Sequence, residues 1–123
     1  MRLLSVIVVA LLSASSFAPI ASAASNKVLC GSGSGDQAIA ACAAVIKSKK
    51  TSSADRARAF NRRANAWADK GEYDKAIADY NQAIKLDPKY AYALNNRGNA
   101  WRSKGEYDKA IADYNKANKL ETR

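Results

Sequence analysis

The chain contains no histidine among its 123 residues. It therefore lacks the side chain that most often serves as a general base near neutral pH and as a metal ligand. The carboxylates do not compensate for this absence, because they are scattered along the chain without the spacing of a metal-ligand set. We predict no enzymatic activity, no cofactor and no metal site.

A hydrophobic run long enough to span a bilayer is also lacking. The one apolar run, residues 3–12, is too short for a stable membrane anchor. It follows a basic residue and precedes the sequence Ala-Ser-Ala at 21–23, which has the small-x-small pattern of signal-peptide cleavage sites. We predict a secretory signal peptide over residues 1–23, a mature protein without a transmembrane span, and a periplasmic or secreted bacterial location.

Cysteine is scarce as well, with Cys30 and Cys42 as the only two. An even pair in an exported protein predicts a disulfide, because thiols are oxidised in that compartment. A ring of this length would stabilise the fold by about 3 kcal/mol on the chain-entropy model. Two alternatives are a pair of free, packed thiols and a lipidated Cys30 before a Gly-Ser tether. Leu29 argues against lipidation, since the residue before a lipidated cysteine is normally small.

The second half of the chain repeats itself. The sequence KGEYDKAIADYN occupies residues 70–81 and again residues 104–115, so the period is 34 residues. A fixed period of this size is typical of stacked repeats. Apolar residues at helical spacing, and a glycine after the first segment of each unit, predict two helices per unit. The expected helices cover residues 57–70, 73–86, 91–104 and 107–120.

Small residues and aromatics recur at the same places in both units. In this pattern residues 57–123 resemble the tetratricopeptide repeat family. The resemblance implies an all-α fold of helix-turn-helix repeats, in which the small residues let the helix backbones cross closely. The recurring residues are Ala64 and Gly98, Ala76 and Ala110, Ala83 and Ala117, Trp67 and Trp101, Tyr73 and Tyr107, and Tyr80 and Tyr114.

The chain departs from the family pattern at Arg63 and Arg97, where the family usually has an apolar residue. We expect each arginine stem to lie along the helix pair with its guanidinium in water. Asp79 and Asp113 lie on the second helices beside aromatic core positions, and we expect them to be solvated too.

Residues 36–46 resemble the second helix of a unit, because the sequence DQAIA at 36–40 matches DKAIA at 74–78. Asp36 is expected to cap a helix over residues 37–47. No first helix is evident before it, so we predict an orphan helix that covers the open face of the first unit. Some exported bacterial repeat proteins are similar, with a cysteine-bearing half repeat before the helix pairs.

The predicted domain therefore has five helices, one orphan and two pairs, with a flexible loop over residues 31–35. The predicted organisation is a signal peptide (1–23), a disulfide-tied capping helix with a linker (24–54), and two repeats (55–123, divided at about 57–90 and 91–123).

Acidic residues are in the minority, with 11 against 20 basic residues and a net charge of +9. The excess lies in residues 47–63, where seven basic residues accompany one acidic residue. One interpretation of this segment is a solvated face that aids solubility. The other is a docking patch for an acidic partner, a polyanion or an anionic envelope surface, but not for nucleic acid. The patch residues are Lys47, Lys49, Lys50, Arg56, Arg58 and Arg62.

The family resemblance implies that the first helices line a concave binding surface. Asparagines would form a ladder along it, and an asparagine amide can pair with the backbone of an extended peptide. Arginines beside the ladder could hold a carboxylate. Alternatively, asparagine is simply tolerated on a wet helix face. The candidate groove residues are Arg58, Asn61, Arg62, Asn65, Tyr92, Asn95, Asn99 and Arg102.

Together these features predict an exported, monomeric protein–protein interaction module that binds a peptide or protein segment in the concave groove. The alternative is a binder of polyanions or anionic envelope surfaces through residues 47–63. The two hypotheses differ in their salt dependence, because polyanion binding weakens steeply as salt rises.

Overall fold

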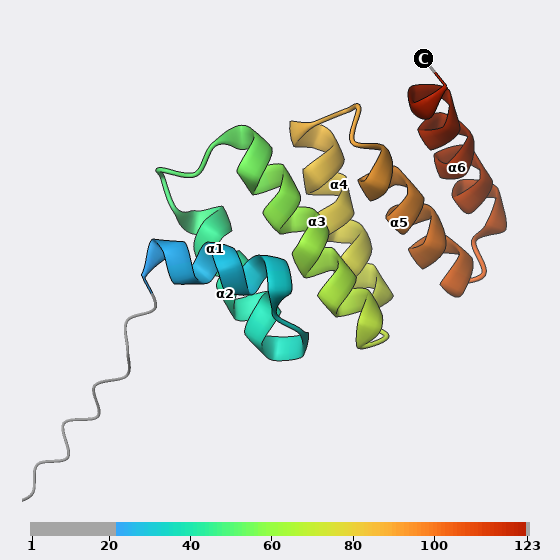
Figure 1. The fold of residues 1–123 in the computed structure, drawn as a ribbon. Coiled ribbons are helices and arrows are strands. Elements are labelled where there is room, and N and C mark those ends of the chain that lie inside the picture. The colour runs from blue at the N-terminus through green and yellow to red at the C-terminus, as the bar shows by residue number, and fades with distance from the viewer. Residues whose placement is uncertain (1–21, 123) are drawn as a thin grey trace, which may run out of the picture.

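The computed structural model describes residues 22–122, and every regular element in that range is a helix. The helices form three antiparallel pairs stacked in chain order (Figure 1). None of the helices in residues 22–122 combines the length and the apolar character needed to cross a bilayer. The described helices are α1 (Ala23–Ser32), α2 (Gly35–Lys47), α3 (Ser53–Asp69), α4 (Tyr73–Leu86), α5 (Ala91–Ser103) and α6 (Tyr107–Glu121).

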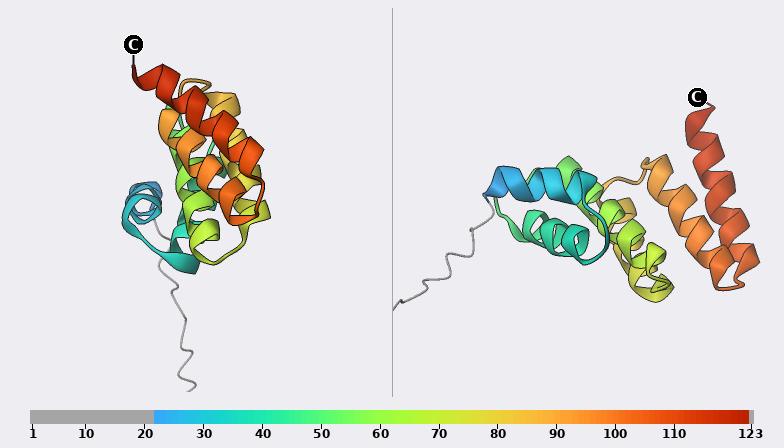
Figure 2. Two further views of the ribbon diagram at one scale, coloured as in Figure 1. Left: turned by 90° about the vertical axis from the view of Figure 1, so that its right-hand side faces the viewer. Right: turned by 60° about the horizontal axis from the view of Figure 1, so that its bottom comes forward.

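The contacts between helices show that the stack is curved. Each first helix packs on its own second helix, and α2 contacts α3 as α4 contacts α5. The first helices also contact one another, α1 with α3 and α3 with α5, whereas the second helices in the described residues do not. Helices α1, α3 and α5 therefore line the inner side of the stack, with α6 at its far edge (Figure 2).

The turn within each repeat is built around a glycine. Gly71 and Gly105 have φ angles of 76° and 80°, in the left-handed region that glycine adopts without strain. In the first turn the amide of Gly71 donates to the carbonyl of Ala68 and the amide of Glu72 donates to that of Trp67, both at 2.9 Å. These two bonds form a Schellman motif, so the predicted helix ends are confirmed.

The core between α3, α4 and α5 consists of small residues and aromatics. Ala64 and Ala76 are fully buried, and Tyr80 is 2% exposed. At Gly98 an added Cβ would lie 2.7 Å from a ring carbon of Tyr114, so this position needs glycine for the helices to approach. The small residues thus act as the repeat pattern predicts, by letting aromatic rings fill the space between helices.

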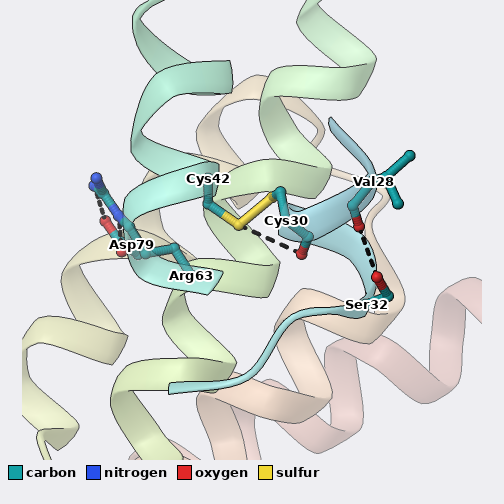
Figure 3. The surroundings of a disulfide bond; sticks show 6 residues. All are labelled: Val28, Cys30, Ser32, Cys42, Arg63 and Asp79. Atoms are coloured by element: carbon teal, nitrogen blue, oxygen red, sulfur yellow. Dashed lines mark hydrogen bonds and ion pairs between the residues drawn. A yellow bond between two sulfur atoms is a disulfide. The ribbon is translucent and has the colours of Figure 1, made fainter. Parts of the chain in front are cut away.

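An arginine–aspartate pair joins the two helices of each repeat. Arg63 Nε and Nη2 donate to the two carboxylate oxygens of Asp79 at 2.7 and 2.8 Å (Figure 3), and Arg97 pairs with Asp113 at 2.7 and 2.6 Å. Both aspartates are 6% exposed. The predictions of solvated arginines and aspartates were therefore wrong. Two charge-assisted hydrogen bonds per pair compensate for the burial of each carboxylate.

The N-terminal region has a helix that the sequence did not reveal. Helix α1 runs through Gly31 and Ser32, so residues 22–122 hold six helices rather than five, and the predicted loop is reduced to two residues. Cys30 of α1 and Cys42 of α2 form a disulfide with their Cα atoms 4.6 Å apart (Figure 3). The helix expected to be an orphan is therefore the second member of a pair.

The expectation that Asp36 caps α2 was wrong. The helix begins at Gly35 with Ser34 as its N-cap, and Asp36 forms an ion pair with Lys70, the C-cap of α3, instead. The same pair recurs one repeat later between Asp74 and Lys104. Asp36 and Asp74 are therefore equivalent positions, as the sequence match predicted. The predicted signal peptide, residues 1–23, lies outside the described residues except for its last two.

Candidate functional site

A polar groove lies between α3 and α5 on the inner side of the stack. Its volume is about 430 Å³. The two helices contribute polar side chains at their facing surfaces, and α4 adds two tyrosines. The lining residues are Asn65, Ala68, Asp69, Tyr73, Tyr80, Asn96, Asn99 and Ser103.

A tyrosine–asparagine hydrogen bond recurs at equivalent places in the two repeats. The hydroxyl of Tyr80 donates to Oδ1 of Asn65 at 2.5 Å, and that of Tyr114 donates to Oδ1 of Asn99 at 2.5 Å. Each bond fixes the orientation of the amide and occupies its oxygen. The NH2 groups of the two asparagines have no recorded partner within residues 22–122, so they remain available as donors.

Asn61 does not belong to this ladder. It is 7% exposed, and its Oδ1 accepts a hydrogen bond from Nδ2 of Asn96 at 3.2 Å. The prediction that Asn61 faces the groove was wrong, because the side chain bridges α3 and α5 below the surface. Asn96 takes part in that bridge and also lines the groove, so it links the groove wall to the interface between the repeats.

Two arginines of α3 and a lysine of α1 form a basic face beside the groove. Arg58 Nη1 lies 3.0 Å from Oδ1 of Asp55, whose other oxygen lies 2.9 Å from Lys27 Nζ of α1. These bonds, led by that from Lys27, hold the pKa of Asp55 below its usual value. Arg62 is exposed and has no recorded ion pair in the described residues, so its charge remains available to a ligand. We define the basic face as Lys27, Arg58 and Arg62.

Tyr90, at the start of α5, lies close to this face. Burial raises the pKa of its hydroxyl, while Arg62, Arg58 and a hydrogen bond with Asn61 act in the opposite direction. The hydroxyl therefore stays protonated at neutral pH and can donate or accept a hydrogen bond beside the two arginines.

The groove itself carries a negative charge at its other end. Asp69 lines it and is exposed. Burial is the main cause that raises the pKa of Tyr80, and the charges of Asp69 and Asp79 add to it. The hydroxyl of Tyr80 therefore keeps its proton and its bond to Asn65 throughout the physiological range. The inner side thus runs from the basic face, through amide donors, to a carboxylate.

The remaining candidate groove residues lie elsewhere on the inner helices. Tyr92 is 74% exposed, and neither it nor Asn95 or Arg102 lines the groove. Sequence reasoning treated Tyr80 only as a core residue and so missed its role in orienting Asn65. The signal was present, because the asparagine and tyrosine are 15 residues apart in both repeats.

The predicted basic patch loses one member to the fold. Arg56 donates to the carbonyls of Ile46, Ser48 and Thr51 at 3.1, 2.9 and 3.3 Å, so it closes the loop between α2 and α3. Its hydrogen-bonding groups are committed to the loop and do not form part of a free surface. The exposed basic residues of the segment are Lys47, Lys49, Lys50, Arg58 and Arg62.

Comparison with known proteins identifies the repeats. A family model described as "TPR repeat" matches residues 64–101, and one described as "Tetratricopeptide repeat" matches residues 91–120. Together the two matches run from the middle of α3 to the last turn of α6. Helices α1 and α2 lie outside them. Curated proteins give no match to the sequence.

Proposed function

We propose that this protein binds an extended peptide segment of a partner protein along the inner side of its stack. The chain belongs to the tetratricopeptide repeat family, whose repeats serve in general as protein–protein interaction modules. The observation that carries the proposal is the pair of oriented asparagines, Asn65 and Asn99, at equivalent places in successive repeats. Their free NH2 groups can donate to main-chain carbonyls of an extended ligand.

The charges beside the groove suggest the polarity of the ligand. An acidic side chain or a terminal carboxylate of the peptide would meet the basic face, where Arg58 and Arg62 can hold it. A basic or neutral segment would lie near Asp69. Main-chain recognition and the absence of histidine favour a binding role over catalysis, so we propose a non-enzymatic module.

We further propose that the protein is exported and acts as a monomer. The disulfide between Cys30 and Cys42 supports an oxidising compartment, because such bonds are rare in the cytosol. The predicted signal peptide points the same way, and it implies a mature domain beginning near residue 24.

Substitution of the two asparagines tests the groove. A ligand peptide is first selected from a random peptide array, and its affinity is measured by calorimetry. Asn65→Ala with Asn99→Ala should weaken binding about 5- to 150-fold, because each of the two lost hydrogen bonds contributes about 0.5–1.5 kcal/mol. Gln82→Ala, on an exposed outer position of α4, is the matched control and should leave binding unchanged.

The second candidate function is binding of polyanions or anionic envelope surfaces through the exposed lysines and arginines of residues 47–63. Heparin and vesicles containing phosphatidylglycerol are suitable probes. This function predicts affinity that falls steeply between 50 and 200 mM salt, and loss of binding on charge reversal at Lys50 and Arg58. Binding that survives the asparagine double substitution but disappears on this charge reversal would replace the groove proposal.

A further inference from the structure

The outer face of α6 repeats a surface that is already used inside the stack. Helix α4 presents a set of side chains to α5, and the same residue types recur on α6, 34 positions later. On α4 the set is covered: Ile77 is 6% exposed, whereas its equivalent Ile111 is 55% exposed. The corresponding residues are Tyr73 and Tyr107, Asp74 and Asp108, Ile77 and Ile111, Tyr80 and Tyr114, and Asn81 and Asn115.

Three features of α5 and its C-cap hold the helix on α4. Lys104 forms an ion pair with Asp74, Arg97 Nη1 donates to Oδ1 of Asn81 at 2.8 Å, and Ala100 packs in the same buried cluster as Ile77. The docked helix is thus recognised by an arginine and a lysine seven residues apart with a small residue between them. The Asp–Lys element also joins α2 to α3, so it is a general feature of neighbouring pairs in this stack.

On α6 the matching groups have no partner in the part of the chain that the structure describes. No ion pair is recorded there for Asp108 and no hydrogen bond for the side chain of Asn115. Tyr107 beside them is 64% exposed. The outer side of α6 is not covered by another described helix (Figure 2). The face combines apolar side chains with a carboxylate and an amide in the arrangement that binds α5.

We propose that the outer face of α6 binds a helix of a partner protein that carries an arginine and a lysine seven residues apart, with a small residue between them. Such a helix would place its lysine on Asp108, its arginine on Asn115 and its small residue on Ile111. This surface is separate from the groove on the inner side, so one module can hold two partners.

A second copy of the chain does not supply such a helix. The arginine and the lysine associated with α3 and with α5 are already paired within the stack. Helix α1 has Lys27 as its single basic residue, and it is paired with Asp55. Asn118 stands on α6 where α4 has Ile84, so the surface of α6 is less apolar at that position. Docking on α6 is therefore weaker than the α4–α5 contact within the chain and is reversible.

A synthetic peptide of residues 87–104, which contains α5, is the probe. Its binding to the full chain is followed by fluorescence anisotropy, and we expect saturation. Ile111→Lys should weaken binding about tenfold or more, since it places a charge where an apolar contact forms. Asp108→Lys should weaken it about three- to tenfold. A peptide that carries Lys104→Asp should restore binding to the Asp108→Lys variant, because the two charges of the pair are then exchanged.

Two control variants separate this face from other surfaces. Lys116→Glu reverses a charge on α6 at the position equivalent to Gln82, which stays exposed although α5 is docked beside it. It should leave peptide binding unchanged. The groove variant Asn65→Ala, which is on α3 and removes no partner of α6, should also leave it unchanged, so failure of the groove proposal would not affect this result.

Three results would overturn the proposal. One is equal binding of the peptide to wild type and to Ile111→Lys. Another is the lack of saturable binding at about 1 mM peptide, which corresponds to an affinity weaker than about −4 kcal/mol. The third is a dimer in light scattering that Ile111→Lys dissociates, because the face would then bind a second copy of the chain.

Discussion

The arginine–aspartate pair of the first repeat leads to a quantitative prediction for stability. Asp79→Ala removes both acceptors of Arg63 and leaves a guanidinium whose side chain is only 23% exposed. Removing one partner of a fully buried pair costs about 3–5 kcal/mol. Because Arg63 keeps some access to water and lies 5.6 Å from the centroid of the Phe60 ring, we expect about 2–3 kcal/mol.

Thermal unfolding followed by circular dichroism measures this cost. In a domain of about 100 residues each kcal/mol shifts the melting temperature by about 4–8 °C, so Asp79→Ala should lower it by about 10–20 °C. Asp74→Ala is the matched control, because it removes an aspartate of the same helix that is 82% exposed in its pair with Lys104. It should change the melting temperature by less than about 4 °C.

A double variant distinguishes pairing from a general effect of the alanine. Arg63→Met in the Asp79→Ala background removes the uncompensated charge and should recover part of the lost stability. The reasoning fails if Asp79→Ala is no more destabilising than Asp74→Ala, since the pair would then contribute no more than an exposed ion pair does.

Three further changes test other parts of the fold. Cys30→Ser with Cys42→Ser should cost about 3 kcal/mol and raise hydrogen exchange in α1 and α2 while the two repeats stay folded; two free thiols in natively purified protein would contradict this. Gly71→Ala should cost about 1–2 kcal/mol in urea unfolding, since its φ is 76° and no atom lies within 4 Å of the added Cβ. The free energy of unfolding should fall as pH rises above about 10. The pKa of Tyr80 is raised in the folded protein, so its hydroxyl is still protonated there at a pH where the unfolded chain has lost that proton. Tyr80→Phe should weaken that dependence, and Tyr107→Phe, at an exposed position, should not.

The repeat period was sufficient to predict the four helices of residues 57–120. Alignment of the two copies shows which positions are equivalent, and the glycines mark the turns. The observed helix bounds therefore differ little from the predicted ones, except at the start of α3. Helix α1 could not be predicted in this way. Its last turn contains Cys30-Gly31-Ser32, a composition that favours a loop. Contacts with α2 and α3, together with the disulfide, outweigh that local preference.

The positions of the groove side chains were predictable only where the same residue occurs at equivalent places in both repeats. Asn65 and Asn99 lie in equivalent environments on the inner side, as the period implies. Asn61 is buried because Asn96 of the next repeat bonds to it, and a contact across 35 residues is not visible in local sequence. The burial of Asp79 had a signal, since both repeats place an arginine 16 residues before the aspartate.

The disulfide gives the stack a direction. In a linear array each unit is held only by its neighbours, so units at the edges open most easily. At one edge the two helices of the first pair are covalently joined, whereas no such link joins α5 to α6 at the other. Local unfolding should therefore start at α6 and advance toward Cys42, so the order in which the helices unfold is set by the position of the disulfide.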